Sequence, residues 1–72
     1  MQVHKATIYG GEEVFEGGRV RVTSGPHVGE CGEVVMIHSY PSKAGSDHVL
    51  VWVRLDGGGN TDAFAPERLE TE

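Results

Sequence analysis

Residues 18–37 decide the predicted fold, and they read GRVRVTSGPHVGECGEVVMI. Near the start of this stretch, Val20 and Val22 alternate with Arg19 and Arg21. A period of two residues is typical of a strand that buries one face and exposes the other. We therefore expect the two valines to face a core and the two arginines to face solvent.

The centre of the same stretch, SGPHVGECG, predicts a tight reversal of the chain. Glycine adopts positive φ or permits close backbone approach, and proline presets φ, so both suit a turn between two strands. Residues 32–38 then form a strand that is apolar on both faces, with Val34 and Met36 expected on one face and Val35 and Ile37 on the other. Such a strand is expected to be central in its sheet or strongly bent.

Further strands are predicted on either side of this stretch, at residues 3–9, 48–55 and 61–65. The second of them is the most apolar part of the chain. One face of it carries Val49, Val51, Val53 and Leu55, and the other carries Leu50 and Trp52. We expect this strand to lie in the core of the sheet.

The segments between these strands have the composition of connections. They are an acidic connector at residues 12–18, a polar loop at residues 40–46 and a glycine-rich reversal at residues 56–60. Near the end of the chain, Pro66 suits the first turn of a helix, and the residues that follow allow no more than one turn.

The length limits these elements to one domain, because 72 residues leave nothing from which to build a second core. The predicted fold is all-β: a five-stranded, partly open barrel with a terminal 3-10 turn, in which closure limits exposed strand edges. Within one domain spanning residues 1–72, we assign residues 1–16 to an N-terminal strand and acidic connector, and residues 17–70 to the barrel core.

The stretch at residues 18–37 resembles the KOW motif of ribosomal proteins and NusG-type transcription factors. That pattern has an initial glycine, alternating valines, a Ser-Gly-Pro turn, two further glycines, and then valine and isoleucine. The matching positions are Gly18, Val20, Val22, Gly25, Pro26, Gly29, Gly32, Val34 and Ile37. The resemblance implies an SH3-like barrel, for which residues 64–69 (FAPERL) look like the final strand and one-turn helix.

The turn departs from the family at the positions that usually bind nucleic acid. Nucleic-acid-associated members tend to carry an aromatic residue and then lysine after Gly-Pro, whereas this chain carries His27 and Val28, followed by Glu30 and Glu33. The whole chain has eleven Asp and Glu against six Lys and Arg, a net charge of −5. Because cations that neutralise phosphates supply most non-specific nucleic-acid affinity, we expect a protein or ribonucleoprotein partner. Direct nucleic-acid binding stays open but is disfavoured.

The candidate binding residues are two arginines, one turn histidine and three ring-bearing residues near the polar loop: Arg19, Arg21, His27, His38, Tyr40 and Trp52. Exposed aromatic residues near loops suit stacking on peptides or bases. The alternative for the arginines is cross-strand pairing with Glu30 or Glu33 on a solvated face. Phe15 and Phe64 are expected in the core, because a small barrel needs large side chains there.

No catalytic site, metal site or cofactor is predicted. The four histidines lack metal-ligand spacing, and Cys31 has no basic neighbour in the sequence, so we expect a buried or half-buried thiol. A single cysteine favours a reducing, cytoplasmic setting. The N-terminal residues lack the apolar run of a signal peptide, and no apolar run is long enough to span a membrane.

The sequence therefore favours a non-enzymatic binding module, associated with transcription or translation through its KOW-like motif. Two alternatives stay open. Residues 60–65 (NTDAFA) look like the corresponding part of small photosystem and ferredoxin-dependent reductase subunits, which implies an accessory subunit of an electron-transfer complex. An enzyme of this size would need a site shared between chains, as in plasmid-borne dihydrofolate reductases built from similar barrels. The oligomeric state is left open.

Overall fold

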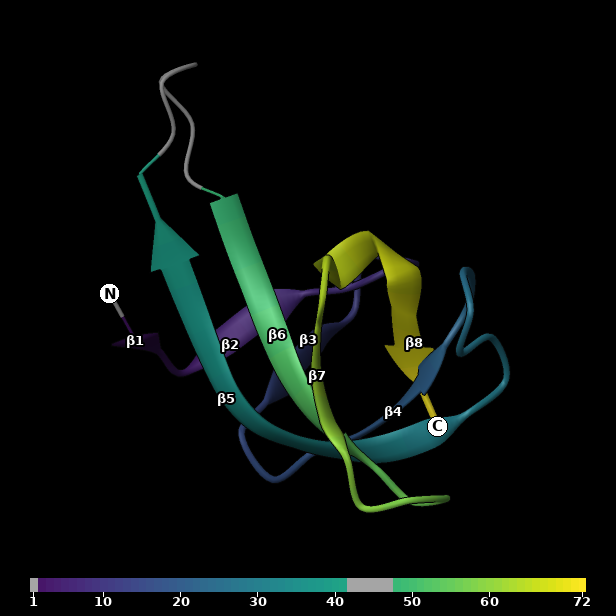
Figure 1. Ribbon diagram of the computed structural model, residues 1–72. Helices are drawn as coiled ribbons and strands as arrows, with labels where there is room; N and C mark the ends of the chain where they lie inside the picture. The colour runs from purple at the N-terminus through teal and green to yellow at the C-terminus, as the bar shows by residue number, and fades with distance from the viewer. Residues whose placement is uncertain (1, 42–47) are drawn as a thin grey trace.

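A computed structural model describes residues 2–41 and 48–72, which form short strands and a single turn of 3-10 helix (Figure 1). In chain order, these elements are β1 (Gln2–Val3), β2 (Lys5–Thr7), β3 (Glu13–Phe15), β4 (Arg19–Val22), β5 (Cys31–Tyr40), β6 (His48–Leu55), β7 (Thr61–Phe64), η1 (Pro66–Arg68) and β8 (Leu69–Thr71). The all-β prediction is confirmed, and so are the bounds of β6 and the single terminal turn. Residues 42–46 of the predicted polar loop lie outside the described residues.

The main sheet is antiparallel and has the strand order β7-β6-β5-β4-β8, with β1 paired to β5 beside this path. A second, two-stranded sheet contains β2 and β3. The described residues thus contain eight strands rather than the predicted five. The path ends at β7 and β8, which do not pair with each other, so the sheet is not closed into a barrel.

The additional strands arise in three places: the predicted strand at residues 3–9, the acidic connector and the chain after η1. The predicted strand at residues 3–9 divides at His4, because β1 pairs with β5 whereas β2 pairs with β3. The acidic connector supplies β3, and the chain after η1 supplies β8, which pairs with β4 and buries Leu69. Local periodicity carries no information on these partners, so the sequence did not reveal these strands.

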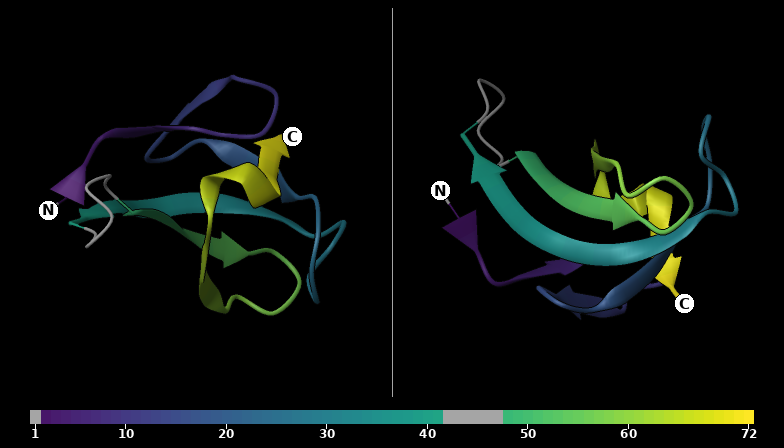
Figure 2. Two further views of the ribbon diagram at one scale, coloured as in Figure 1. Left: turned by 90° about the horizontal axis from the view of Figure 1, so that it is seen from above. Right: turned by 60° about the horizontal axis from the view of Figure 1, so that its bottom comes forward.

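A bulge in β5 overturns the predicted faces of this strand. The pairing with β6 shifts between Val34 and Met36, so that Val35 is an extra residue without a cross-strand partner. As a result Val34 and Ile37 are both buried in the core, whereas Val35 is 39% exposed on the opposite face. An extra residue reverses the alternation and bends the strand, and the strong curvature of β5 is visible in Figure 2. The strand was predicted to be central or strongly bent, and β5 is both central in the strand order and bent.

The hydrophobic core draws on both sheets. Its buried members are Ala6, Ile8, Val14, Val20, Val22, Val34, Ile37, Val51, Val53, Leu55, Phe64 and Leu69. Phe64 is 2% exposed, as expected, but the prediction for Phe15 is wrong, because this ring is 54% exposed. The alternation in β3 explains the difference: Val14 faces the core, so its neighbour Phe15 must face outward.

Glycine serves two different purposes between the end of β4 and the start of β5. Gly25 and Gly29 have φ of 90° and 88°, values that favour glycine, so the predicted reversal is confirmed. Gly32 has no positive φ, but a Cβ atom there would lie 2.6 Å from Val53 Cγ1 and against the carbonyl oxygen of Arg54. The absence of a side chain at Gly32 lets β5 approach β6 closely.

We expect Gly32→Ala to lower the free energy of unfolding by about 1–3 kcal/mol, the usual cost of an extra methyl group in a packed interior. Urea unfolding followed by circular dichroism measures this change. Gly57→Ala is the matched control, because the nearest atom to a Cβ there is Glu30 Oε1 at 3.8 Å. Equal stabilities of the two variants would contradict the close approach of β5 to β6.

Candidate functional site

The outer face of the main sheet is the side of β5 and β6 that points away from the hydrophobic core. The bulge at Val35 divides this face into two parts with different chemistry. On the β4 side of the bulge, charged residues such as Arg19, Glu33 and Arg54 occupy it. Beyond the bulge it carries Met36 and aromatic side chains, so only this part offers an apolar surface.

Three rings from two strands form what we call the aromatic cluster: His38, Tyr40 and Trp52. The His38 and Tyr40 rings stack with centroids 5.7 Å apart and planes 24° apart. Trp52 meets His38 edge-on at 5.7 Å and lies tilted against Tyr40 at 6.4 Å. These separations are typical of interacting aromatic pairs. The structure therefore brings together three of the six residues expected to bind.

Strand pairing places two apolar side chains beside the aromatic cluster. Met36 lies opposite Trp52, and Leu50 lies opposite His38. The partly buried hydrophobic residues that pack against the core are Val3 and Val49. Met36, Leu50 and Trp52 are half-buried instead on the opposite face, while Tyr40 remains 37% exposed. The cluster and its apolar neighbours are thus separate from the core.

A carboxylate lies at the β1 edge of this surface. Gln2 of β1 pairs with His38 and donates from Nε2 to Glu16 Oε2 at 3.1 Å. The other carboxylate oxygen of Glu16 lies 3.1 Å from Nδ1 of His4. Among the described residues, no lysine or arginine forms an ion pair with Glu16. Glu16 is therefore connected through Gln2 to the strand edge beside His38.

The two arginines of β4 are bound to carboxylates of the same chain. The Arg19 guanidinium donates to both oxygens of Asp56, one at 3.0 Å, and its Nε donates to Glu72 at 3.1 Å. Arg21 Nη1 lies 3.5 Å from Glu70 Oε2. The structure shows the alternative for the arginines, which is pairing with carboxylates on a solvated face. The acceptors are Asp56, Glu72 and Glu70 rather than Glu30 or Glu33.

These contacts shift the pKa of the groups involved. The hydrogen bond from Arg19 lowers the pKa of Asp56, and the hydrogen bond to Asp56 raises the pKa of Arg19. The pKa of Arg21 is raised first by its hydrogen bond to the Cys31 side chain, which lies opposite on β5, and then by Glu70. Cys31 is half-buried and free, as expected. Its basic neighbour comes from strand pairing, which the local sequence did not show.

His27 lies apart from the aromatic cluster and connects the turn between β4 and β5 to β7. Its Nδ1 is 2.7 Å from Glu30 Oε2, and its Nε2 is 3.2 Å from Asp62 Oδ2. Its ring also meets Phe64 edge-on, with centroids 6.1 Å apart. Both ring nitrogens therefore face carboxylates of the chain, so His27 holds the turn in place and the structure does not join it to the other candidate residues.

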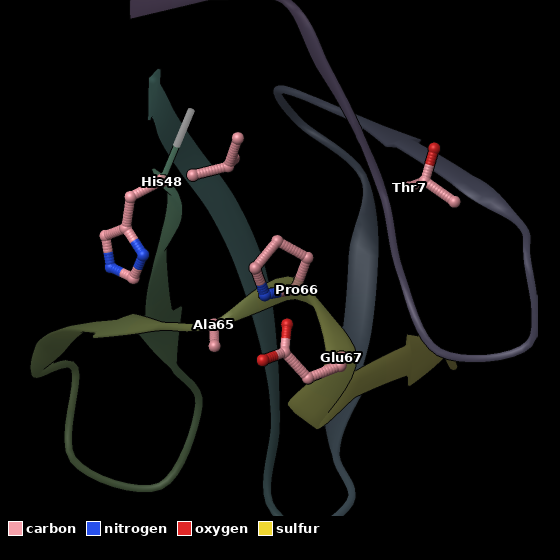
Figure 3. Close-up of a pocket in the computed structure, with 6 residues that line it drawn as sticks. Thr7, His48, Ala65, Pro66 and Glu67 are labelled. Atoms are coloured by element: carbon pink, nitrogen blue, oxygen red, sulfur yellow. The ribbon is translucent and has the colours of Figure 1, made fainter. Parts of the chain in front are cut away.

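A cavity of about 280 Å³ opens beside the first residues of β6 and η1 (Figure 3). It is lined by Thr7, His48, Val49, Ala65, Pro66 and Glu67. Pro66 lies between His48 and Thr7 in this view. Within the described part of the chain, no hydrogen bond joins the three polar side chains that line it, so the cavity shows no pairing of a nucleophile with a base.

Two further findings concern residues 2–41 and 48–72. No group of three or more His, Cys, Asp or Glu residues in these ranges could hold a metal ion. The same ranges contain no helix with the length and apolar character needed to cross a bilayer.

Comparison of the chain with protein-family models, with curated proteins and with solved structures finds no match. The geometry and charges of the chain itself are therefore what indicate its function.

Sequence reasoning identified His38, Tyr40 and Trp52 but missed three neighbours. Met36 is expected to share a face with Val34, whereas the bulge turns it to the opposite face and leaves no sign in the periodicity. Leu50 shares a face with Trp52 in the predicted strand, so side-chain alternation already indicated that the two residues are neighbours. No pattern in the sequence indicated Glu16, because its position depends on contacts with Gln2 and His4 of the N-terminal segment.

The lowered pKa of Asp56 predicts a specific pH dependence of stability. In the unfolded chain Asp56 has an ordinary pKa near ~3.9, and the folded value lies below it. The Arg19–Asp56 pair therefore stabilises the fold fully above about pH 4, and this contribution is lost as the pH falls through the folded pKa. Thermal unfolding of the wild type and of Asp56→Asn between pH 7 and pH 2.5 measures the effect.

We expect Asp56→Asn to melt below the wild type at pH 7 and the difference to shrink at the acid end. Arg19→Met serves as the second variant, because removing the guanidinium removes the cause of the shift. If Asp56→Asn follows the wild-type curve at every pH, the pair does not contribute to stability.

Proposed function

We propose that this chain is a non-enzymatic binding module that docks on a protein partner through the aromatic cluster. The observation that carries the proposal is the mutual contact of His38, Tyr40 and Trp52 on a sheet face that points away from the core. These rings are not needed to fill the interior, since the core has its own set of buried residues. A partner would remove their remaining exposed surface from water.

The cluster has the properties of an energetic centre in a protein interface. Tryptophan and tyrosine are enriched among residues whose truncation weakens binding most. Here they stand on two paired strands, so the backbone of the site is ordered before a partner arrives, and less conformational entropy is lost on docking. The flanking Met36 and Leu50 extend the apolar surface that a partner could cover.

The charges favour a protein over a nucleic acid as partner. Within the described residues, Lys5, Arg19, Arg21 and Arg54 each form an ion pair with a carboxylate of the chain. Arg68 donates to the carbonyl oxygen of Ser24 and lies over the Phe64 ring. A phosphate backbone would have to displace these acceptors and approach a chain of net charge −5.

The domain type that we propose is an SH3-like domain of the KOW class. The support comes from the glycine geometry of the turn, the bent β5 after it, and the sequence of β7 and η1. The KOW-like motif also makes a component of the transcription or translation machinery our proposed partner. The motif acts as a folding element, so the ligand is argued from the aromatic cluster and not from the turn.

The test is a capture experiment followed by reconstitution. Immobilised wild type, Tyr40→Ser and Tyr9→Ser variants are incubated with cell extract, and proteins retained by the wild type are identified by mass spectrometry. Each is then purified and titrated by calorimetry. Tyr9→Ser is the matched control, because Tyr9 is 63% exposed and lies outside the aromatic cluster.

We expect a purified partner to bind the wild type and Tyr9→Ser equally, and to bind Tyr40→Ser at least about tenfold more weakly. Tyr40→Ser removes a partly exposed ring, and unfolding curves of both variants show whether the fold is kept. If every purified partner binds Tyr40→Ser as tightly as the wild type, the aromatic cluster is not the docking surface.

A further inference from the structure

We propose that the partner segment that occupies the aromatic cluster is cationic and carries arginine side chains. This inference rests on the proposed function, because it specifies the chemistry of the partner at the same surface. It follows from three features: the faces of the rings, the carboxylate at their edge, and the state of the chain's own cations.

The first feature is the electrostatics of the rings. Aromatic faces carry partial negative charge and attract a guanidinium placed above them. The same chain already shows such a contact elsewhere, where Arg68 Cζ lies 5.7 Å from the centroid of the Phe64 ring. Tyr40 is 37% exposed and Trp52 is half-buried, so ring surface in the cluster remains open to a cation from outside.

The second feature is the carboxylate of Glu16. Through Gln2 it lies at the β1 edge of the surface, and its described partners are Gln2 and His4. An arginine that stacks on the cluster could therefore also reach an acceptor at the edge. Such a pair of contacts suits the planar guanidinium, which stacks and donates hydrogen bonds at the same time.

The third feature is that the arginine beside Trp52 on β6 donates to a carboxylate outside the aromatic cluster. Arg54 follows Trp52 by two residues on the same face of β6, and its Nη2 donates to Glu33 Oε1 at 2.8 Å. Glu33 therefore holds this guanidinium on the charged side of the bulge. Among the described lysines and arginines, none has a ring contact with the aromatic cluster.

The net charge of the whole chain adds long-range attraction. Among the described carboxylates, Glu12, Glu16, Glu30, Asp62 and Glu67 form no ion pair with lysine or arginine. These groups account for much of the net charge of −5. A cationic segment is therefore attracted to the protein, whereas an acidic segment or a phosphate chain is repelled.

The experiment titrates the protein at pH 7.5 with a synthetic peptide of alternating glycine and arginine. Fluorescence of Trp52, the single tryptophan of the sequence, and amide chemical shifts report binding. The matched probes are the same peptide with citrulline in place of arginine, an alternating glycine and aspartate peptide, and a decauridine RNA. Variants are Tyr40→Ser, Glu16→Gln and the control Tyr9→Ser.

We expect the arginine peptide to bind with shifts at residues of β5 and β6, and the citrulline peptide to bind at least about fivefold more weakly. Tyr40→Ser should weaken binding by a similar factor, Glu16→Gln by a smaller one, and Tyr9→Ser should leave it unchanged. Added salt should weaken binding of the arginine peptide.

Equal binding of the arginine and citrulline peptides would overturn the inference, and so would tighter binding of the aspartate peptide or the RNA. Arginine-peptide binding that Tyr40→Ser leaves unchanged would also overturn it, because the cation would then bind elsewhere. A purified protein partner that depends on Tyr40 but is not displaced by the arginine peptide would refute this inference alone. The proposed function would stand in that case, and it fails only if no partner depends on Tyr40.

Discussion

The bulge at Val35 is the constraint on which the rest of the structure depends. β5 must pair with β4, β6 and β1 while the sheet curves around a small core, and a regular strand would present Val34 and Met36 to the same side. One extra residue lets Val34 and Ile37 both enter the core and turns Met36 outward. The side chains beyond the bulge, His38 and Tyr40, follow the new alternation. The core and the aromatic cluster are therefore two consequences of one irregularity.

The same bulge separates two kinds of surface. On the β4 side, arginines and carboxylates neutralise one another, as in the pairs of Arg19 with Asp56 and of Arg54 with Glu33. Solvent-exposed pairs of this kind contribute little stability individually, but they engage the cations that could otherwise bind an anionic ligand. Beyond the bulge lie rings and apolar side chains, and Gln2, which pairs with His38, donates to the carboxylate of Glu16. Among the described residues, the lysines and arginines contact acceptors of the same chain, and this is why we propose a cationic partner for the aromatic cluster.

The candidate site could be predicted only in part from the sequence. His38, Tyr40 and Trp52 were identified because alternation placed Trp52 opposite the valine face of β6, and because Tyr40 begins the predicted polar loop next to His38. Arg19, Arg21 and His27 were grouped with them as polar residues of the motif. The structure shows that their contacts are with Asp56, Glu70 and Glu30, among others. Ion pairs between distant segments depend on strand order, which periodicity does not encode.

By itself, the sequence determined the features that depend on neighbouring residues. These are the inward and outward faces of β4 and β6, the glycine turn, the short helix after Pro66, and the acidic net charge. Only the tertiary structure decided which strands pair, where β5 gains its extra residue, and that Phe15 faces outward while Phe64 is buried. The physical reason is the range of the interactions. Side-chain alternation and turn geometry act within a few residues, whereas register, bulges and burial are set by contacts with segments distant in the chain.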